Sequence, residues 1–227
     1  MKVTELIGQL RRFTFILSIT KVIQRNLHHA IEIILYLFFL SFLDHAYFDV
    51  AIIEMDLTVE FSNSIYPICI PETASGIDNR VNVGASLAGW GATENFNGEP
   101  STVLKETKMN VFAQSHCNSS WDITSIALPE AANVEKEIPE LFQSNLLCAG
   151  STNTIGNGKA CGGDSGSPLM VFDTRSTPPK WVHIGLVHGG VVCSNFYKNL
   201  NFPEIFSRTE DSEVLNFIKN VMDGILR

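Results

Sequence analysis

Short apolar segments, rich in β-branched residues, recur along the chain from residue 47 onward and are separated by clusters of turn-forming residues. Segments of this length with little helical periodicity are typical of strands in an all-β sandwich or barrel. Gly- and Asn-rich clusters at residues 95–100 and 152–158 mark two of the turns. The predicted strands cover residues 50–55, 86–90, 107–112, 169–172 and 181–187.

The C-terminal segment has a different period. Its apolar residues fall on one face of a helix, and Asp211 stands where an N-cap is expected. This pattern predicts an α-helix at the C-terminal end. The residues on the apolar face are Val214, Leu215, Ile218, Val221 and Ile225.

The first 45 residues differ from the rest and contain an apolar run at 33–43 that only Ser41 interrupts. Eleven residues are too few to span a bilayer, and the run lies further from Met1 than the apolar region of a signal peptide. We expect a buried strand or helix here, or sequence foreign to the fold, rather than a membrane anchor. The predicted division is therefore a divergent segment, residues 1–45, and a domain over residues 46–227.

Composition narrows the class of protein. The 227 residues are 45% hydrophobic with a net charge of −8, and no basic cluster is longer than Arg11-Arg12. These features indicate a folded chain and argue against nucleic acid as a partner. The cysteines have no metal-ligand spacing, and their wide separation favours disulfides in an oxidising compartment. There are five of them, Cys69, Cys117, Cys148, Cys161 and Cys193, which leaves one without a partner in this chain.

Residues 161–168 read Cys-Gly-Gly-Asp-Ser-Gly-Ser-Pro and carry the strongest chemical signal. Glycines on both sides let the chain turn sharply and leave Ser165 uncrowded. They also leave the N–H groups of Gly163 and Ser165 free to face a substrate oxygen. The pattern predicts a serine nucleophile beside an oxyanion hole rather than an ordinary polar turn.

Four further segments agree with this interpretation, and with residues 161–168 they resemble the trypsin/chymotrypsin family of serine endopeptidases. They are Tyr47-Phe-Asp-Val-Ala-Ile-Ile-Glu54, Tyr66-Pro-Ile-Cys-Ile-Pro71, Ala88-Gly-Trp-Gly91 and Asn145-Leu-Leu-Cys-Ala-Gly150. The resemblance extends from about Tyr47 to Met222. It implies a trypsin-like antiparallel Greek-key double β-barrel whose first barrel is incomplete, followed by a C-terminal α-helix.

The resemblance also implies a function and a set of roles. The reaction is peptide-bond hydrolysis through an acyl-enzyme on Ser165, with a protein or peptide substrate, no metal or organic cofactor, and a secreted location. Asp49 matches the catalytic aspartate that orients the histidine base. Asp164 matches the acid that a new ammonium terminus neutralises after activation. No activation site like the family's occurs here, so we expect an uncompensated charge on Asp164 and a rearranged, zymogen-like loop.

The base is not identified by a motif. None of the six histidines, His28, His29, His45, His116, His183 and His188, stands in the family's Ala-Ala-His-Cys setting. The chain as given is therefore expected to lack the motif histidine and to be truncated or inactive. His188 matches a serine that hydrogen-bonds the catalytic aspartate. We favour a partly buried histidine bonded to a carboxylate over the alternative, a replacement base.

The specificity pocket departs from that of trypsin-like enzymes. Lys159 stands at the pocket floor, where those enzymes have an aspartate, and Glu204 replaces a glycine that keeps the pocket open. Gly189 replaces an aromatic wall residue. A buried Lys159–Glu204 pair is expected, with no cleavage after Lys or Arg. Two alternatives stay open, a preference for acidic side chains and an occluded pocket.

By family position, Cys117 pairs with Cys148 and Cys161 with Cys193. Cys69 then bonds to an N-terminal pro-segment or light chain. Two functions remain after these comparisons of residues: a serine endopeptidase, and a catalytically inactive homologue that acts as a binding or regulatory module. The retained Ser165, Asp164 and Asp49 and the unpaired Cys69 favour the first, which is the function we predict. The missing base, Lys159, Glu204 and Gly189 favour the second.

Overall fold

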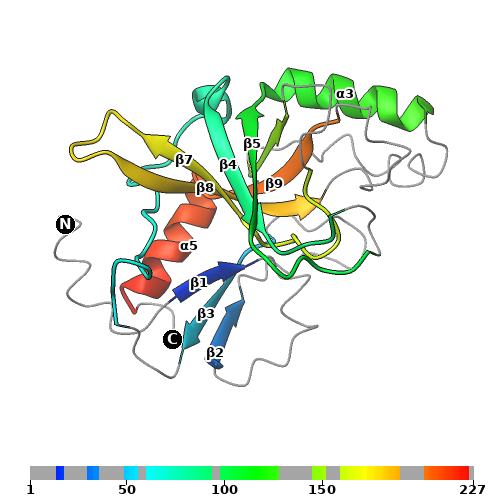
Figure 1. The fold of residues 1–227 in the computed structure, drawn as a ribbon. Coiled ribbons are helices and arrows are strands. Elements are labelled where there is room, and N and C mark those ends of the chain that lie inside the picture. The colour runs from blue at the N-terminus through cyan, green and yellow to red at the C-terminus, as the bar shows by residue number, and fades with distance from the viewer. Residues whose placement is uncertain are drawn as a thin grey trace.

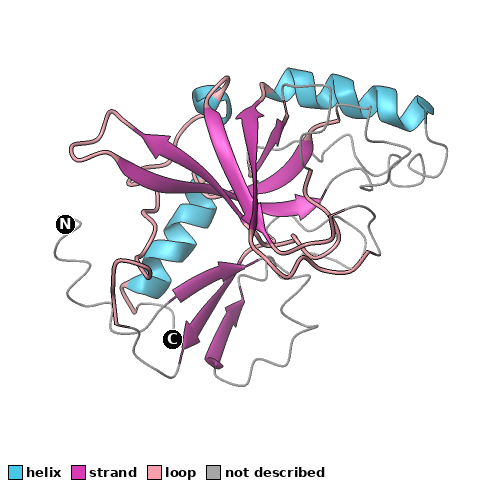
Figure 2. Ribbon diagram, in the orientation of Figure 1, coloured by secondary structure: helices cyan, strands magenta, loops and turns pink. Residues whose placement is uncertain are grey.

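The computed structural model describes residues 14–17, 30–35, 49–55, 60–93, 98–127, 145–151, 159–189 and 202–224 of the chain. Strands dominate these residues, and two α-helices accompany them (Figure 2). The all-β prediction with a C-terminal helix is confirmed.

Six antiparallel strands form a closed barrel in the order β4-β5-β6-β9-β8-β7. The chain crosses the barrel between β6 and β7, so that β6 lies beside β9. Each expected strand overlaps an observed one, three of them running one residue past one of its ends. The barrel strands are β4 (Gly84–Gly89), β5 (Lys105–Val111), β6 (Leu146–Gly150), β7 (Pro168–Asp173), β8 (Lys180–Gly189) and β9 (Glu204–Arg208).

Apolar side chains from every barrel strand fill its interior. In β7 the buried residues alternate, with Leu169 and Val171 pointing inward, as the period-2 pattern of a strand requires. Each such side chain contributes about 1.5–3 kcal/mol when it is fully removed from water. Ile184 and Phe206, both fully buried, complete the centre of the core.

A second, three-stranded antiparallel sheet has the order β1-β3-β2 and consists of β1 (Thr14–Leu17), β3 (Ala51–Met55) and β2 (Ala30–Leu35). This sheet stands where the sequence predicts an incomplete first barrel. Part of the apolar run at 33–43 lies in β2, and residues 36–43 fall outside the described residues. The central strand β3 is the apolar segment predicted at residues 50–55.

The helix α5 (Ser212–Met222) lies between the small sheet and the barrel (Figure 1). Its buried face, with Val214, Phe217 and Ile218, packs against Val50 beside β3 and Leu186 of β8. Asp211 caps its N-terminus, because the Asp211 side chain accepts hydrogen bonds from two backbone N–H groups of the first turn. The predicted helix and its N-cap are confirmed; Ile225 lies outside the described residues.

The helix α3 (Gln114–Ala127) was not predicted from the sequence. It carries Cys117, which forms a disulfide with Cys148 of β6 at a Cα–Cα distance of 6.3 Å. This confirms the first expected cysteine pair and fixes the start of α3 to the barrel wall.

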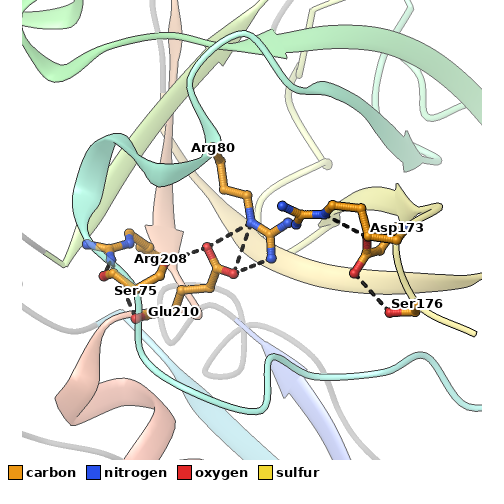
Figure 3. Close-up of polar contacts among 7 residues, drawn as sticks. Ser75, Arg80, Asp173, Ser176, Arg208 and Glu210 are labelled. Atoms are coloured by element: carbon orange, nitrogen blue, oxygen red, sulfur yellow. Dashed lines mark hydrogen bonds and ion pairs between the residues drawn. The ribbon is translucent and has the colours of Figure 1, made fainter.

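A buried polar network fixes the connection between the small sheet and the barrel (Figure 3). The Arg80 Nε atom donates to both carboxylate oxygens of Glu210, at 3.0 and 3.2 Å, and the Ser75 hydroxyl donates to the same carboxylate at 3.0 Å. Arg208 adds a bond to the Ser75 carbonyl. The Glu210 hydrogen bond raises the pKa of Arg80. Because Glu210 stands just before Asp211, the network connects residues 75–80 to the start of α5.

Candidate active site

Residues 161–167 form two successive turns in front of β7. The Asp164 N–H donates to the Cys161 carbonyl at 2.9 Å, and the Ser167 N–H donates to the Asp164 carbonyl at 2.8 Å. The third position of each turn is a glycine with positive φ, 108° at Gly163 and 81° at Gly166. A type II turn needs this conformation there, and glycine adopts it without strain. The glycine spacing in the sequence therefore gives the loop its shape.

These turns present Ser165 at the loop's centre. The Ser165 side chain is half-buried, and its hydroxyl has no hydrogen-bond partner in the described parts of the chain. The N–H groups of Gly163 and Ser165 likewise make no hydrogen bond with any described residue. A hydroxyl and two amide donors are thus left unused in these two turns, and an oxyanion hole needs such unused donors.

Asp164 lies under the loop with its carboxylate buried. The carboxylate accepts the Gly91 N–H at 2.7 Å and the Cys161 N–H at 2.9 Å. A Cβ atom at Gly89 or Gly91 would overlap with the same carboxylate, which explains both glycines of the Gly-Trp-Gly segment. The two backbone donors replace part of the water that burial removes from the Asp164 carboxylate.

The loop is attached to the end of β8. The Gly166 N–H donates to the Val187 carbonyl at 2.8 Å, and the Val187 N–H donates to the Ser167 carbonyl at 3.0 Å. Ser165 directly precedes Gly166, and His188 directly follows Val187, so both residues adjoin these hydrogen bonds. The backbone brings the nucleophile loop and His188 to the same end of the barrel.

Asp49 lies at this end too. Its Oδ2 atom is 3.0 Å from Nδ1 of His188, and the Asp49 side chain is 1% exposed against 24% for His188. Val50 and Leu186 stand one and two positions from the pair and belong to the same core cluster, which holds the two segments together. The expected bond between His188 and the carboxylate is confirmed.

The expected pocket residues are Glu204 on β9, Gly189 at the end of β8 and Lys159 just before the nucleophile loop. Glu204 is buried and accepts the Ala160 backbone N–H; burial raises the pKa of Glu204 to about 8, and the Lys159 charge lowers it in part. Burial lowers the pKa of Lys159, and the Glu204 charge opposes that change. The charge of each side chain thus acts on the pKa of the other. A Cβ at Gly189 would meet no atom of the described residues within 4 Å, its chain neighbours left aside.

Comparison with known proteins gives the chain a family. The Trypsin family model matches residues 20–213. The chain belongs to the trypsin family. It is 30% identical over 178 residues to the clotting factor G beta subunit of Tachypleus tridentatus, covering 78% of this chain and 51% of that protein. It is 29% identical over 166 residues to serine protease 28 of Mus musculus, covering 73% of this chain and 52% of that protein.

A third relative is the serine proteinase stubble of Drosophila melanogaster, 29% identical over 168 residues, which are 74% of this chain and 18% of that protein. The chain thus spans about half of the length of two of these relatives and less of the third. The second and third relatives are named as a serine protease and a serine proteinase. The trypsin-family match begins at residue 20, within the segment that sequence reasoning set apart.

The remaining histidines take different positions in this trypsin-family fold. His183 is buried on β8, its Nδ1 lies 2.8 Å from the Thr209 hydroxyl, and burial lowers its pKa to about 4. His116 is exposed on α3 and contacts the Phe112 ring. His28, His29 and His45 lie outside the described residues. His188 is therefore the described histidine that reaches the Asp49 carboxylate.

The other cysteines follow the expected pattern in part. Cys69 is a free, half-buried thiol that pairs through its backbone with Val182. Cys161 is in a disulfide, and its expected partner, Cys193, lies outside the described residues. Among the residues that the structure describes, no helix is both long and apolar enough to cross a bilayer. The same residues contain no cluster of His, Cys, Asp or Glu side chains arranged to hold a metal ion.

Proposed function

We propose that this chain is the catalytic part of a serine endopeptidase that hydrolyses peptide bonds through an acyl-enzyme on Ser165. The observation that carries the proposal is the meeting of the Ser165 loop, with its unused amide donors, and the buried Asp49 carboxylate at one end of β8. The family assignment supports the same reaction class.

Each residue has one role in this reaction. The Ser165 hydroxyl attacks the substrate carbonyl, and the N–H groups of Gly163 and Ser165 stabilise the oxyanion that forms. Asp49 orients a histidine base and stabilises its cation. Asp164 keeps the loop in shape through its bonds to Gly91 and Cys161.

Substrate choice depends on Lys159 and Glu204. A cation at the pocket floor repels Lys and Arg side chains, so we propose no trypsin-like cleavage. A mostly protonated Glu204 leaves Lys159 as the charge of the pocket, which favours an acidic side chain of the substrate where the pocket is open.

A second candidate is an inactive homologue that binds a partner through the former substrate face. The buried Glu204, which occupies the position of a pocket glycine, favours it. For either function we propose an extracellular location, because the Cys117–Cys148 bridge is typical of an oxidising compartment. We also propose that Cys69 bonds to an N-terminal pro-segment or light chain.

Labelling with a fluorophosphonate probe separates the two candidates. The full chain, produced in an oxidising compartment, is expected to become covalently labelled, with the adduct mapped to Ser165 by mass spectrometry. Ser165→Ala should abolish labelling, and Ser167→Ala, two residues away, should retain it. A folded wild-type protein that the probe leaves unlabelled would refute the endopeptidase and support the binding module.

A further inference from the structure

His188 connects a buried charge to the outside of the barrel. Its Nδ1 atom is 3.0 Å from the Asp49 carboxylate, which is almost fully buried, while about a quarter of the His188 side chain is exposed. When one nitrogen of an imidazole ring faces a carboxylate, the other nitrogen lies on the side of the ring that points away from it. In His188 that nitrogen is Nε2.

A β-bulge explains why His188 leaves the barrel wall. Val187 pairs with Phe206 and Gly189 pairs with Ile205, so that His188 has no partner on β9. Residues 182–187 of β8 are buried, and burial ends at His188. Bulges of this kind bend a strand and redirect a side chain, often beside an active site. Here the bulge follows Leu186, whose packing on Val50 brings Asp49 within reach.

The same bulge lies beside the nucleophile loop. Two hydrogen bonds join Val187 to Gly166 and Ser167, at 2.8 and 3.0 Å. Ser165 is the residue before Gly166, and His188 is the residue after Val187. At Gly189, apart from its chain neighbours, no atom of a described residue lies within 4 Å of the position that a Cβ would take.

We propose that His188 is the general base for Ser165, so that Asp49, His188 and Ser165 form a catalytic triad whose histidine comes from β8. The inference rests on the proposed endopeptidase function. With Nδ1–H donating to Asp49, the lone pair of Nε2 is left as the proton acceptor. In proteins without bound substrate the serine–base hydrogen bond is often long and tightens on binding.

The proton and the bonds balance in two halves. Nε2 takes the hydroxyl proton as the bond from Ser165 Oγ to the carbonyl carbon forms, and it gives that proton to the amine nitrogen as the peptide C–N bond breaks. A water then loses a proton to Nε2 and attacks the acyl carbon, and the proton returns to Ser165 Oγ as the ester bond breaks. The carboxylate of Asp49 stabilises the imidazolium in both halves.

The rate of fluorophosphonate labelling of the full chain tests this base. His188→Gln keeps an N–H donor for Asp49 but has no basic nitrogen, so it separates base catalysis from the support of Asp49. We expect His188→Gln and His188→Ala to react about 100-fold or more slowly than the wild type, as is typical of losing a general base. Free imidazole should restore part of the rate to His188→Ala, and His116→Gln, on the exposed face of α3, should react like the wild type.

Three results have distinct meanings. Equal labelling rates of the wild type and a folded His188→Gln would overturn the proposal and leave His188 as a partner of Asp49 only. No effect of imidazole on a folded His188→Ala would also count against the base. An unlabelled wild type would instead refute the endopeptidase function on which the proposal rests.

Discussion

Gly91 and Asp164 depend on each other at the scale of single residues. The Asp164 carboxylate occupies the space that a side chain at residue 91 would need, and the Gly91 N–H donates to it at 2.7 Å. A buried carboxylate is stable only when donors replace its water. The shape of the nucleophile loop therefore depends on a residue 73 positions earlier in the chain.

Gly91→Ala should displace the Asp164 carboxylate and distort the loop. Losing a hydrogen bond to a charged group costs about 1.5–3 kcal/mol, so we expect a decrease of that size in the free energy of unfolding, measured in urea. Labelling of Ser165 should fall with it. Gly84→Ala is the control, because the nearest atom to its Cβ position is 4.0 Å away. A Gly91→Ala protein as stable and as reactive as that control would contradict the assignment.

The local parts of the site could be predicted from the sequence. The turns at 161–167 follow from glycine spacing, because positive φ is a property of single positions. The partners of Asp164 could not be predicted in this way. The family position of Asp164 pointed to an ammonium terminus as the partner in activated relatives, and without an activation site we expected an uncompensated charge. The carboxylate accepts backbone N–H groups of Gly91 and Cys161, which carry no signal of their own in a sequence.

At the scale of elements, the two helices differ in how well the sequence marks them. α5 has an apolar face and an N-cap, so both its existence and its start were predicted. α3 contains Ser, Asn, Thr and Asp at many positions, and these residues are weak helix formers. Its Cys117–Cys148 bridge supplies a long-range constraint that no local pattern contains.

Asp211→Ala tests the cap of α5. The Asp211 side chain accepts from the N–H groups of Glu213 and Val214, and losing such a cap costs about 1 kcal/mol. We expect a corresponding loss in the free energy of unfolding by chemical denaturation. Asp223→Ala, at the exposed C-terminal end of the same helix, should change stability by less than about 0.5 kcal/mol. Equal effects of the two substitutions would refute the role of the cap.

At the scale of the whole molecule, the important contacts join distant segments. His188 and Asp49 are 139 positions apart, and Arg80 and Glu210 are 130 apart. Only the family position of His188 predicts the first contact, and nothing in the sequence predicts the second. The periodicity of a strand predicts where the strand lies in the chain, but it does not predict which distant segment the strand packs against. In the folded chain, the core cluster of Val50, Leu186 and α5 holds together the segments that carry Asp49 and His188.

Two buried groups give the stability of the whole protein opposite dependences on pH. Burial lowers the pKa of His183 to about 4 from 6.5. Between these values the unfolded chain binds a proton that the folded one does not, so stability rises with pH. Burial raises the pKa of Glu204 to about 8 from 4.5. Between those values the folded chain binds the extra proton, so stability falls with pH.

Each group contributes a slope of about 1.4 kcal/mol per pH unit where only one state is protonated, so the two slopes nearly cancel between about pH 5 and 6. His183→Gln should therefore lose stability with rising pH relative to the wild type in this range, by about 1.4 kcal/mol per unit. Glu204→Gln should gain by a similar amount, and it should continue to gain on the wild type up to about pH 8, because Glu204 of the folded wild type keeps its extra proton up to that pH. Urea unfolding at pH 5, 6 and 7 measures these differences. Variant curves that run parallel to that of the wild type would mean that neither group has the shifted pKa on which this balance depends.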